Sequence, residues 1–311
     1  MAEIMVSVLM VTYNHDKYIS KAIETVLDQE TKFDFELVIG EDCSTDNTRN
    51  IIEEYSKKHP DKIRLFSGDK NVGSTQNEIT IVKASKGKYL AFCEGDDYWT
   101  DPFKLQNQVD FLEANPDYGL VHSDVNHFNQ KTGELTIAFN KRSDIDIPSG
   151  NIFQFLMDPS HSIKTMTVCL RRDLLSKYYY GNETIMSSNW KMIDISIWLM
   201  ISYYSKIKYM DEVTATYRML PESMSRTQNA VKLNDLHNKI YSIYYYFLDN
   251  FCDSEDIRKR INVKYNLMNF NDAYILGDRE LQKLYYTKLK KCNYKFSMKQ
   301  YLMILKLKLL G

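Results

Sequence analysis

The first hundred residues alternate between short apolar runs and segments whose apolar residues recur at helical spacing. Four of the runs predict buried β-strands, at residues 6–11, 35–39, 63–66 and 89–93. The segment after the first run has Ile19, Ile23 and Leu27 on one helical face, and the segments after residues 44–47 and from residue 74 to 85 follow the same pattern. This order predicts an α/β domain with a mainly parallel sheet and helices on both of its faces.

The remaining two thirds of the chain changes character along its length. Its expected elements are a helix at residues 101–115, strands at 119–122 and 165–170, loops with a hairpin at 131–150, and a helix at 190–204. From about Val231, tyrosine and leucine recur in long helical patterns to the end, with little strand signal. We therefore expect a boundary near Thr227, with one domain at residues 1–226 and a helical region at residues 227–311.

Polar clusters follow three of the predicted strands, at the point where each strand ends. They lie at residues 12–14, 41–44 and 94–97. Ligands of open α/β sheets bind beyond the carboxyl ends of the strands, so the sequence predicts one crevice lined by all three clusters.

The third cluster carries three carboxylates, Glu94, Asp96 and Asp97, directly after an apolar strand. Like charges this close repel one another and raise each other's pKa. A divalent cation makes such a cluster favourable, and carboxylate oxygens suit Mg²⁺ or Mn²⁺. The alternative is a solvated acidic turn, which is a common feature of surface loops.

Composition narrows the class of protein. The net charge of −1 over 311 residues argues against a nucleic-acid binder. The five cysteines are odd in number and form no C-x-x-C pair, which favours free thiols in a reducing compartment and a cytoplasmic location. The chain start lacks the basic region of a signal peptide, and no apolar stretch approaches the length of a membrane span.

Four segments together resemble motifs of the family 2 glycosyltransferases, which are inverting enzymes with the GT-A fold. They are Val8-Leu9-Met10-Val11-Thr12-Tyr13-Asn14, Glu41-Asp42-Cys43-Ser44-Thr45-Asp46-Asn47-Thr48, Asn71-Val72-Gly73, and Glu94-Gly95-Asp96-Asp97 followed by Tyr98-Trp99. The resemblance is strong over residues 4–115, weaker to residue 226 and absent beyond. It implies a Rossmann-like mixed sheet flanked by helices, with a nucleotide-sugar half at residues 1–97, an acceptor half at residues 98–226 and a C-terminal helical extension.

The resemblance also implies roles for individual residues. The nucleotide would be bound by Thr12, Tyr13, Asn14, Glu41, Asp42, Asn71 and Asp96. The metal ion, Mn²⁺ or Mg²⁺, would be held on the diphosphate by Glu94, Asp96 and Asp97. For Asp42, a helix N-terminal charge partner is the alternative. Trp99 could stack on a sugar, although a large aromatic residue beside a helix start is more often part of the core.

The second half of the chain offers two further candidates. Asp194 resembles the family's general base, where Ile193 replaces the usual Glu, and the alternative is a helix-capping aspartate. Arg218 resembles a residue that could face the diphosphate, and the alternative is a surface ion pair. The chain departs from the family pattern at Glu41 and Glu94, which replace Asp, and at Gln76, which stands where relatives often carry a basic residue.

The expected function is transfer of one sugar from a UDP-linked or other nucleotide-diphospho-sugar to a hydroxyl of a glycan or lipid-linked acceptor in surface polysaccharide synthesis. Two rivals stay open. One is a non-catalytic nucleotide-sugar or glycan-binding protein. The other is a sugar-phosphate nucleotidyltransferase, whose Gly-rich loop is lacking after the first strand.

The C-terminal segment, residues 301–310, is apolar with interspersed lysines. Such a segment can lie on an anionic membrane surface, which suits an enzyme with a lipid-linked acceptor. The alternative is a terminal helix packed on the protein with a solvated basic face.

Overall fold

The computed structural model describes residues 3–142, 146–188, 190, 193–221 and 229–309. The chain forms two compact units. The first comprises Met1–Phe153 and Ser162–Leu220, and the second comprises Gln154–His161 and Pro221–Gly311. The boundary expected near Thr227 falls outside the described residues.

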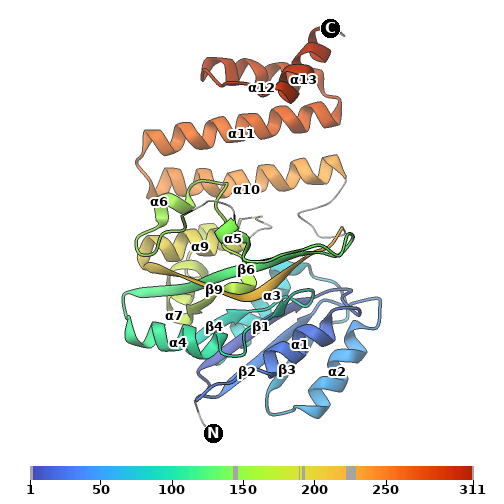
Figure 1. Cartoon of the computed structure of the whole chain (residues 1–311), viewed down its shortest axis with the longest axis vertical. Helices are drawn as coiled ribbons and strands as arrows, with labels where there is room; N and C mark the ends of the chain where they lie inside the picture. The colour runs from blue at the N-terminus through green and yellow to red at the C-terminus, as the bar shows by residue number, and fades with distance from the viewer. Residues whose placement is uncertain (1–2, 143–145, 189, 191–192, 222–228, 310–311) are drawn as a thin grey trace. The chain divides into compact units, whose positions relative to one another are not determined.

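The first unit is built on one mixed β-sheet (Figure 1). Its described strands are β1 Val6–Thr12, β2 Phe35–Glu41, β3 Ile63–Ser67, β4 Tyr89–Phe92, β5 Tyr98–Trp99, β6 Tyr118–Asn129, β7 Leu135–Thr136, β8 Cys169–Arg171 and β9 Lys206–Met219. They are ordered β3-β2-β1-β4-β8-β6-β9-β5, with β7 paired to β6. Strands β1 to β4 run parallel to one another, and β8 then pairs antiparallel with β4 and β6.

The helices of the first unit alternate with strands β1 to β4, as the apolar pattern predicts, and follow one another less regularly in its second half. They are α1 Ile19–Leu27, α2 Thr48–Lys58, α3 Ser74–Ala84, α4 Lys104–Ala114, α5 Phe139–Arg142, α6 Phe153–Leu156 (which continues into the second unit), α7 Arg172–Leu174, α8 Glu183–Met186 and α9 Ile193–Tyr204, with short 3₁₀ and π turns at Thr165–Thr167 and Leu175–Tyr180. The predicted α/β class and the helices flanking the sheet are confirmed.

Two predictions for the second half of this unit differ from the structure, and a further strand forms where the sequence predicts none. The strand expected at 119–122 extends to Asn129 as β6, because its polar residues pair with β9. The strand expected at 165–170 is a 3₁₀ turn followed by the short strand β8. Strand β9 was not predicted.

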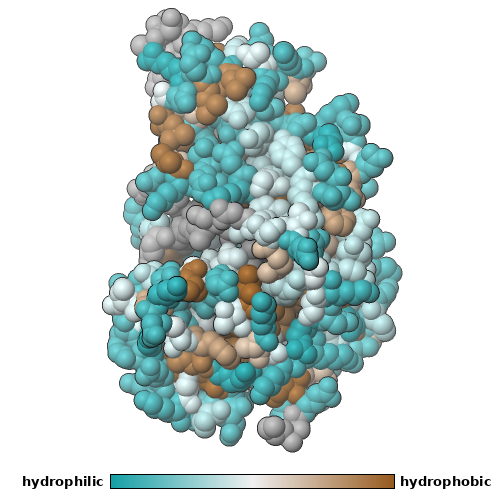
Figure 2. All heavy atoms as spheres, turned by 180° about the vertical axis from the view of Figure 1, so that it is seen from behind, coloured by the Kyte–Doolittle hydropathy of each residue, from teal (hydrophilic) through white to brown (hydrophobic). Residues whose placement is uncertain are grey.

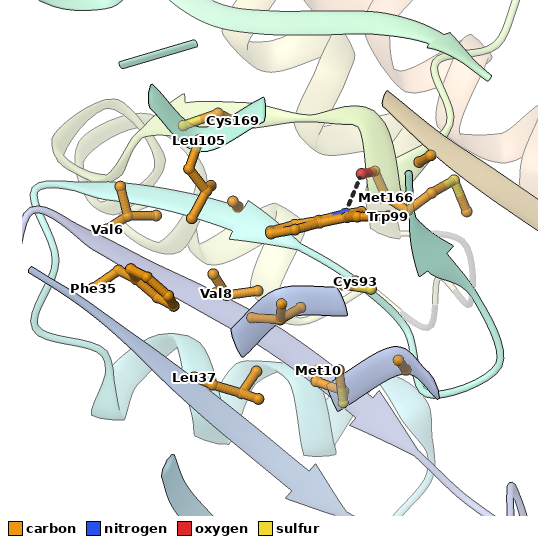
Figure 3. Close-up of a cluster of buried hydrophobic side chains, with 14 of the residues drawn as sticks. Val6, Val8, Met10, Phe35, Leu37, Cys93, Trp99, Leu105, Met166 and Cys169 are labelled. Carbon is orange, nitrogen blue, oxygen red and sulfur yellow. Dashed lines mark hydrogen bonds between the residues drawn. The ribbon is translucent and has the colours of Figure 1, made fainter. Parts of the chain in front are cut away.

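The core of the first unit lies between the sheet and the helices, and Figure 3 shows part of it. Val6, Val8 and Met10 of β1 are fully buried there. Trp99 is only 2% exposed, and its Nε1–H donates to the carbonyl of Met166 at 2.9 Å. Trp99 is therefore a core residue, and the alternative of a sugar-stacking ring is wrong.

The second unit consists mainly of helices α10 Ala230–Phe251, α11 Glu255–Leu276, α12 Arg279–Lys291 and α13 Met298–Leu309. The first three begin with side-chain caps, in which Asn229, Ser254 and Asp278 accept from backbone N–H groups. Gly277 ends α11 in the left-handed conformation at φ 72°, which glycine adopts without steric cost. The predicted C-terminal helical extension is confirmed.

Among the described residues, no helix combines the length and apolar character needed to cross a bilayer. In the view from behind, hydrophobic residues form separate patches among hydrophilic ones (Figure 2).

Candidate functional site

The loops that follow β1, β2 and β4 are joined to one another by hydrogen bonds. The backbone N–H of Asn14 donates to Ser44 Oγ at 3.0 Å, and that of Thr45 donates to Asn14 Oδ1 at 2.8 Å. Asn14 takes a left-handed backbone at φ 56°, which asparagine tolerates better than most residues. The Gly95 N–H donates to the carbonyl of Val11 at 3.1 Å. The three polar clusters of the sequence thus lie together at one end of the parallel strands.

Gly95 permits the loop after β4 to approach the loop after β1 closely. A Cβ at this position would lie 2.6 Å from Thr12 Oγ1 and 2.9 Å from His15 Nδ1. Thr12 Oγ1 and His15 Nδ1 are themselves 3.1 Å apart, so glycine lets this polar group pack against the acidic loop. His15 Nε2 also lies 4.0 Å from a carboxylate oxygen of Asp96.

Asp42 joins the loop after β2 to the turn before α3. Its carboxylate accepts from the backbone N–H groups of Val72 at 2.7 Å and Gly73 at 2.9 Å. Asn71 Nδ2 donates to the carbonyl of Asp42 at 2.9 Å. Gly73 is the N-cap residue of α3, so the carboxylate lies at the N-terminus of that helix, which fits the alternative of a helix N-terminal charge partner. A nucleotide contact by Asp42 stays a prediction.

Glu41 is buried and both of its carboxylate oxygens have partners. One accepts from the Ser44 N–H at 2.5 Å, and the other accepts from Arg49 Nε at 2.6 Å. Burial alone would raise the pKa of Glu41, but the hydrogen bonds from Ser44 and Arg49 outweigh it and the pKa lies below its usual value. These contacts hold the loop in shape, and a nucleotide contact by Glu41 stays a prediction. Tyr13 is 43% exposed beside this loop.

The acidic loop after β4 places its three carboxylates in different surroundings. Asp97 is buried and accepts from the backbone N–H of Arg218 at 2.6 Å. The side chain of Asp96 is 19% exposed. Glu94 has a buried Oε2 for which no hydrogen-bond partner exists among the described residues.

Burial and, after it, the charges of neighbouring carboxylates raise the pKa values of two carboxyl groups in this loop. Burial, followed by the charges of Asp96 and Asp194, raises the pKa of Glu94 to about 8. Burial and the charges of Asp96 and Glu94 raise the pKa of Asp97 well above its usual value. A cation bound nearby would reverse this cost, because it favours the ionised carboxylates.

The chemistry of these side chains fits a divalent cation, since they are hard oxygen donors with an unpartnered buried oxygen among them. Their geometry is not that of a completed site. Over the part of the chain that the structure describes, no three His, Cys, Asp or Glu side chains surround a common metal position. The metal-ligand set Glu94, Asp96 and Asp97 therefore stays a prediction.

Asp194 lies in the first turn of α9, far along the chain from the acidic loop. Burial raises its pKa, whereas the positive charge of Lys164 lowers it. Its charge in turn raises the pKa of Glu94, so the two carboxyl groups lie within interaction range. Ile193 stands where the family motif has Glu, so the fit to that motif rests on Asp194 alone, and residues 191–192 lie outside the described part of the chain.

Glu78 is a site residue that the sequence did not reveal. It lies on α3, and burial together with the charges of Asp194 and Glu94 raises its pKa to about 8. A single glutamate on a helix carries no distinctive signal, because its environment depends on residues distant in sequence. The structure thus adds a fifth carboxyl group to Glu94, Asp96, Asp97 and Asp194, and we call this set the acidic cluster.

Arg218 on β9 closes one side of the acidic loop. Its Nε donates to the carbonyl of Asp96 at 2.8 Å. Its guanidinium carbon lies 4.8 Å from the ring centre of Tyr18, 5.2 Å from that of Tyr98 and 5.7 Å from that of Phe128. Arg218 is therefore held in place by the loop and by aromatic rings, and it adds positive charge beside the carboxylates. Residues 222–228, which follow β9 and Pro221, lie outside the described residues.

Three comparisons with known proteins bear on this site. A model of Glycosyl transferase family 2 matches residues 7–177, more than half of the chain. An uncharacterized protein of Mycobacterium tuberculosis is 41% identical over 111 residues, which are 36% of this chain and 32% of that protein. The chain thus matches about a third of the length of this relative.

An Escherichia coli protein named UDP-Glc:alpha-D-GlcNAc-diphosphoundecaprenol beta-1,3-glucosyltransferase WfaP is 26% identical over 256 residues, covering 79% of this chain and 93% of WfaP. Among solved structures, the mannosyltransferase PcManGT from Pyrobaculum calidifontis, in complex with GDP-Man and Mn²⁺, has a TM-score of 0.57 at 14% identity and covers 98% of this chain and 79% of its own. At that identity the likeness concerns the fold alone, and it confirms the GT-A architecture.

Proposed function

The chain belongs to glycosyl transferase family 2, and we propose that it transfers one sugar, with inversion, from a nucleotide-diphospho-sugar to a hydroxyl group of an acceptor. The observation that carries this proposal is the loop after β4, where Glu94, Asp96 and Asp97 stand together and Arg218 is hydrogen-bonded to the loop. It lies beside the loops after β1 and β2, where ligands of such sheets bind. A purely structural turn would gain nothing from three carboxyl groups side by side, one of which has a buried oxygen without a hydrogen-bond partner among the described residues.

Asp194 is the proposed general base. A catalytic base works best when its pKa lies near the working pH, and burial moves the pKa of Asp194 in that direction. Asp194 would accept the proton of the acceptor hydroxyl while that oxygen bonds to the anomeric carbon. The bond from the anomeric carbon to the diphosphate breaks on the opposite face, and the nucleoside diphosphate leaves with the bonding electrons.

The remaining residues would bind and orient the donor. Thr12, Asn14 and Asp42 would contact the nucleoside, and Arg218 would offer positive charge to the diphosphate. A divalent cation, when bound, would neutralise charge on the leaving diphosphate. Glu94, Asp96 and Asp97 would hold it.

The donor and acceptor classes are proposed from similarity. The name of WfaP gives UDP-Glc as its donor and a diphosphoundecaprenol-linked sugar as its acceptor. We therefore propose a UDP-linked donor and a glycan or lipid-linked saccharide acceptor in surface polysaccharide synthesis. Cys43, Cys93, Cys169, Cys252 and Cys292 are all free thiols, which supports a reducing, cytoplasmic location.

The test measures UDP release from a panel of UDP-sugars with Mn²⁺, with and without saccharide acceptors. Wild type should release UDP, and Asp194→Asn should lose about 10²- to 10⁴-fold of the acceptor-dependent rate while its affinity for UDP stays unchanged. The matched control is Asp61→Asn, which removes an exposed aspartate from a loop of the same unit. Binding of UDP-sugars without any release by wild type would favour the non-catalytic binding protein instead.

A further inference from the structure

Helix α13 carries apolar side chains on two opposite faces, and the second unit uses only one of them. Met303 and Ile304 are buried and pack with Phe270, Tyr285 and Leu289, which come from α11 and α12. This contact accounts for the position of α13 within the second unit. It does not account for the apolar side chains on the opposite face of the helix.

The opposite face presents four exposed apolar side chains in one row. Met298 is 78% exposed, Tyr301 53%, Leu302 56% and Leu305 52%. Their spacing of three, four and seven residues places them on a single side of the helix, and we call them the α13 stripe. A continuous apolar row that the fold leaves in water indicates an interaction surface.

The segment that contains the α13 stripe is strongly basic. From Leu281 to Gly311 the chain has eight lysines and no aspartate or glutamate. The lysines at positions 288, 290 and 291 lie in the last turn of α12, Lys295 lies in the connection to α13, and Lys299 lies in the first turn of α13. Each of these five side chains is exposed. A partner for this surface must therefore combine an apolar layer with negative charge.

We propose that the α13 stripe and the lysines around it bind the surface of an anionic lipid bilayer, with α13 lying in the plane of the interface. The apolar row would enter the boundary between headgroups and acyl chains, and the lysines would meet anionic headgroups. A second copy of this chain fits the surface poorly, because it would bring one lysine-rich segment against another. The inference rests on the proposed lipid-linked acceptor for its purpose, since membrane binding would bring the enzyme to such a substrate.

The test is co-sedimentation of the full chain with phosphatidylcholine vesicles that contain or lack phosphatidylglycerol, without donor or acceptor. Wild type should bind only the anionic vesicles, and added salt should release it, because salt screens the lysine charges. Each lysine near such a surface accounts for about a fivefold change in binding, so Lys295→Gln combined with Lys299→Gln should weaken binding by about 25-fold. Leu302→Ser combined with Leu305→Ser should also weaken it, because the apolar contribution is lost.

The matched control is Lys57→Gln combined with Lys58→Gln, which removes the same charge from exposed positions on α2 and should leave vesicle binding unchanged. Circular dichroism verifies that each variant is folded. Transfer to a water-soluble acceptor, measured separately, reports on the proposed enzymatic function and should be equal in wild type and in all of these variants. Equal binding to neutral and anionic vesicles would overturn the proposal. So would unchanged binding of the stripe variants, or a dimer in solution that the Leu302 and Leu305 substitutions dissociate.

Discussion

Replacing Glu78 by glutamine should stabilise the protein at alkaline pH and leave its stability nearly unchanged at acid pH. Burial, followed by the charges of Asp194 and Glu94, raises the pKa of Glu78 from 4.5 to about 8 in the folded state. A carboxyl group with a raised folded pKa favours folding while it is protonated, and this contribution is lost as pH rises from the unfolded value through the folded one. Wild type should therefore lose stability between about 4.5 and about 8, whereas the glutamine side chain does not ionise.

The size of the effect follows from the shift in pKa. Each unit corresponds to about 1.4 kcal/mol, so the change from 4.5 to about 8 sets a ceiling of roughly 5 kcal/mol. Water entry and rearrangement around the ionised carboxylate lower this ceiling, and we expect a gain of about 2 kcal/mol in the free energy of unfolding.

The assay is urea unfolding followed by circular dichroism in metal-free buffer, at pH values near 4.5 and near 8. The control is Glu54→Gln, an exposed glutamate on α2 whose replacement should have no pH-dependent effect. If Glu78→Gln gave the same change at both pH values, or destabilised the protein near pH 8, the inferred penalty on the ionised Glu78 carboxylate would be wrong.

Three further substitutions test the packing of the site. Gly95→Ala would place a Cβ 2.6 Å from Thr12 Oγ1 and 2.9 Å from His15 Nδ1. It should therefore lower the free energy of unfolding by about 1–3 kcal/mol and weaken UDP binding, and an unchanged urea midpoint and UDP affinity would contradict this. Arg218→Lys should lose the hydrogen bond to the Asp96 carbonyl and lower the free energy of unfolding, measured with urea, by about 2 kcal/mol. Unaltered stability would show that the guanidinium does not stabilise the acidic loop. Trp99→Phe should lower the free energy of unfolding by about 1–3 kcal/mol, because the hydrogen bond to the Met166 carbonyl is lost, and it should leave the KM for the donor unchanged. A raised KM with unchanged stability would instead indicate that Trp99 contacts the sugar.

The first half of the fold was predictable because its strands are buried on both faces. Parallel strands of this kind are nearly continuous apolar runs, and β1, β2 and β4 are buried along almost their whole length. Strand β9 escaped prediction because its middle carries Asp211 and Glu212 at exposed positions, and much of the strand is only partly buried. Strand β9 forms because it pairs with β6, although its own sequence lacks an alternating apolar pattern.

The candidate site was predictable only where its residues are neighbours in sequence. Glu94, Asp96 and Asp97 stand together after a buried strand, so their repulsion could be anticipated from the chain alone. Asp194 was found through a family resemblance, and the structure adds its interaction with Glu94. Glu78 could not be found, because its burial and its acidic neighbours arise from tertiary packing that joins α3, α9 and the loop after β4.

A crystal structure with bound nucleotide would show directly whether Asp96 and Asp97 lie at the metal ion and the diphosphate. A crystal structure of the protein soaked with UDP and Mn²⁺ should show the diphosphate at the carboxyl end of β4, with the ion bound by the carboxylates of the acidic loop and Asp194 facing the side from which an acceptor would approach. UDP bound at another place, or Asp96 and Asp97 turned away from both ion and diphosphate, would contradict the account.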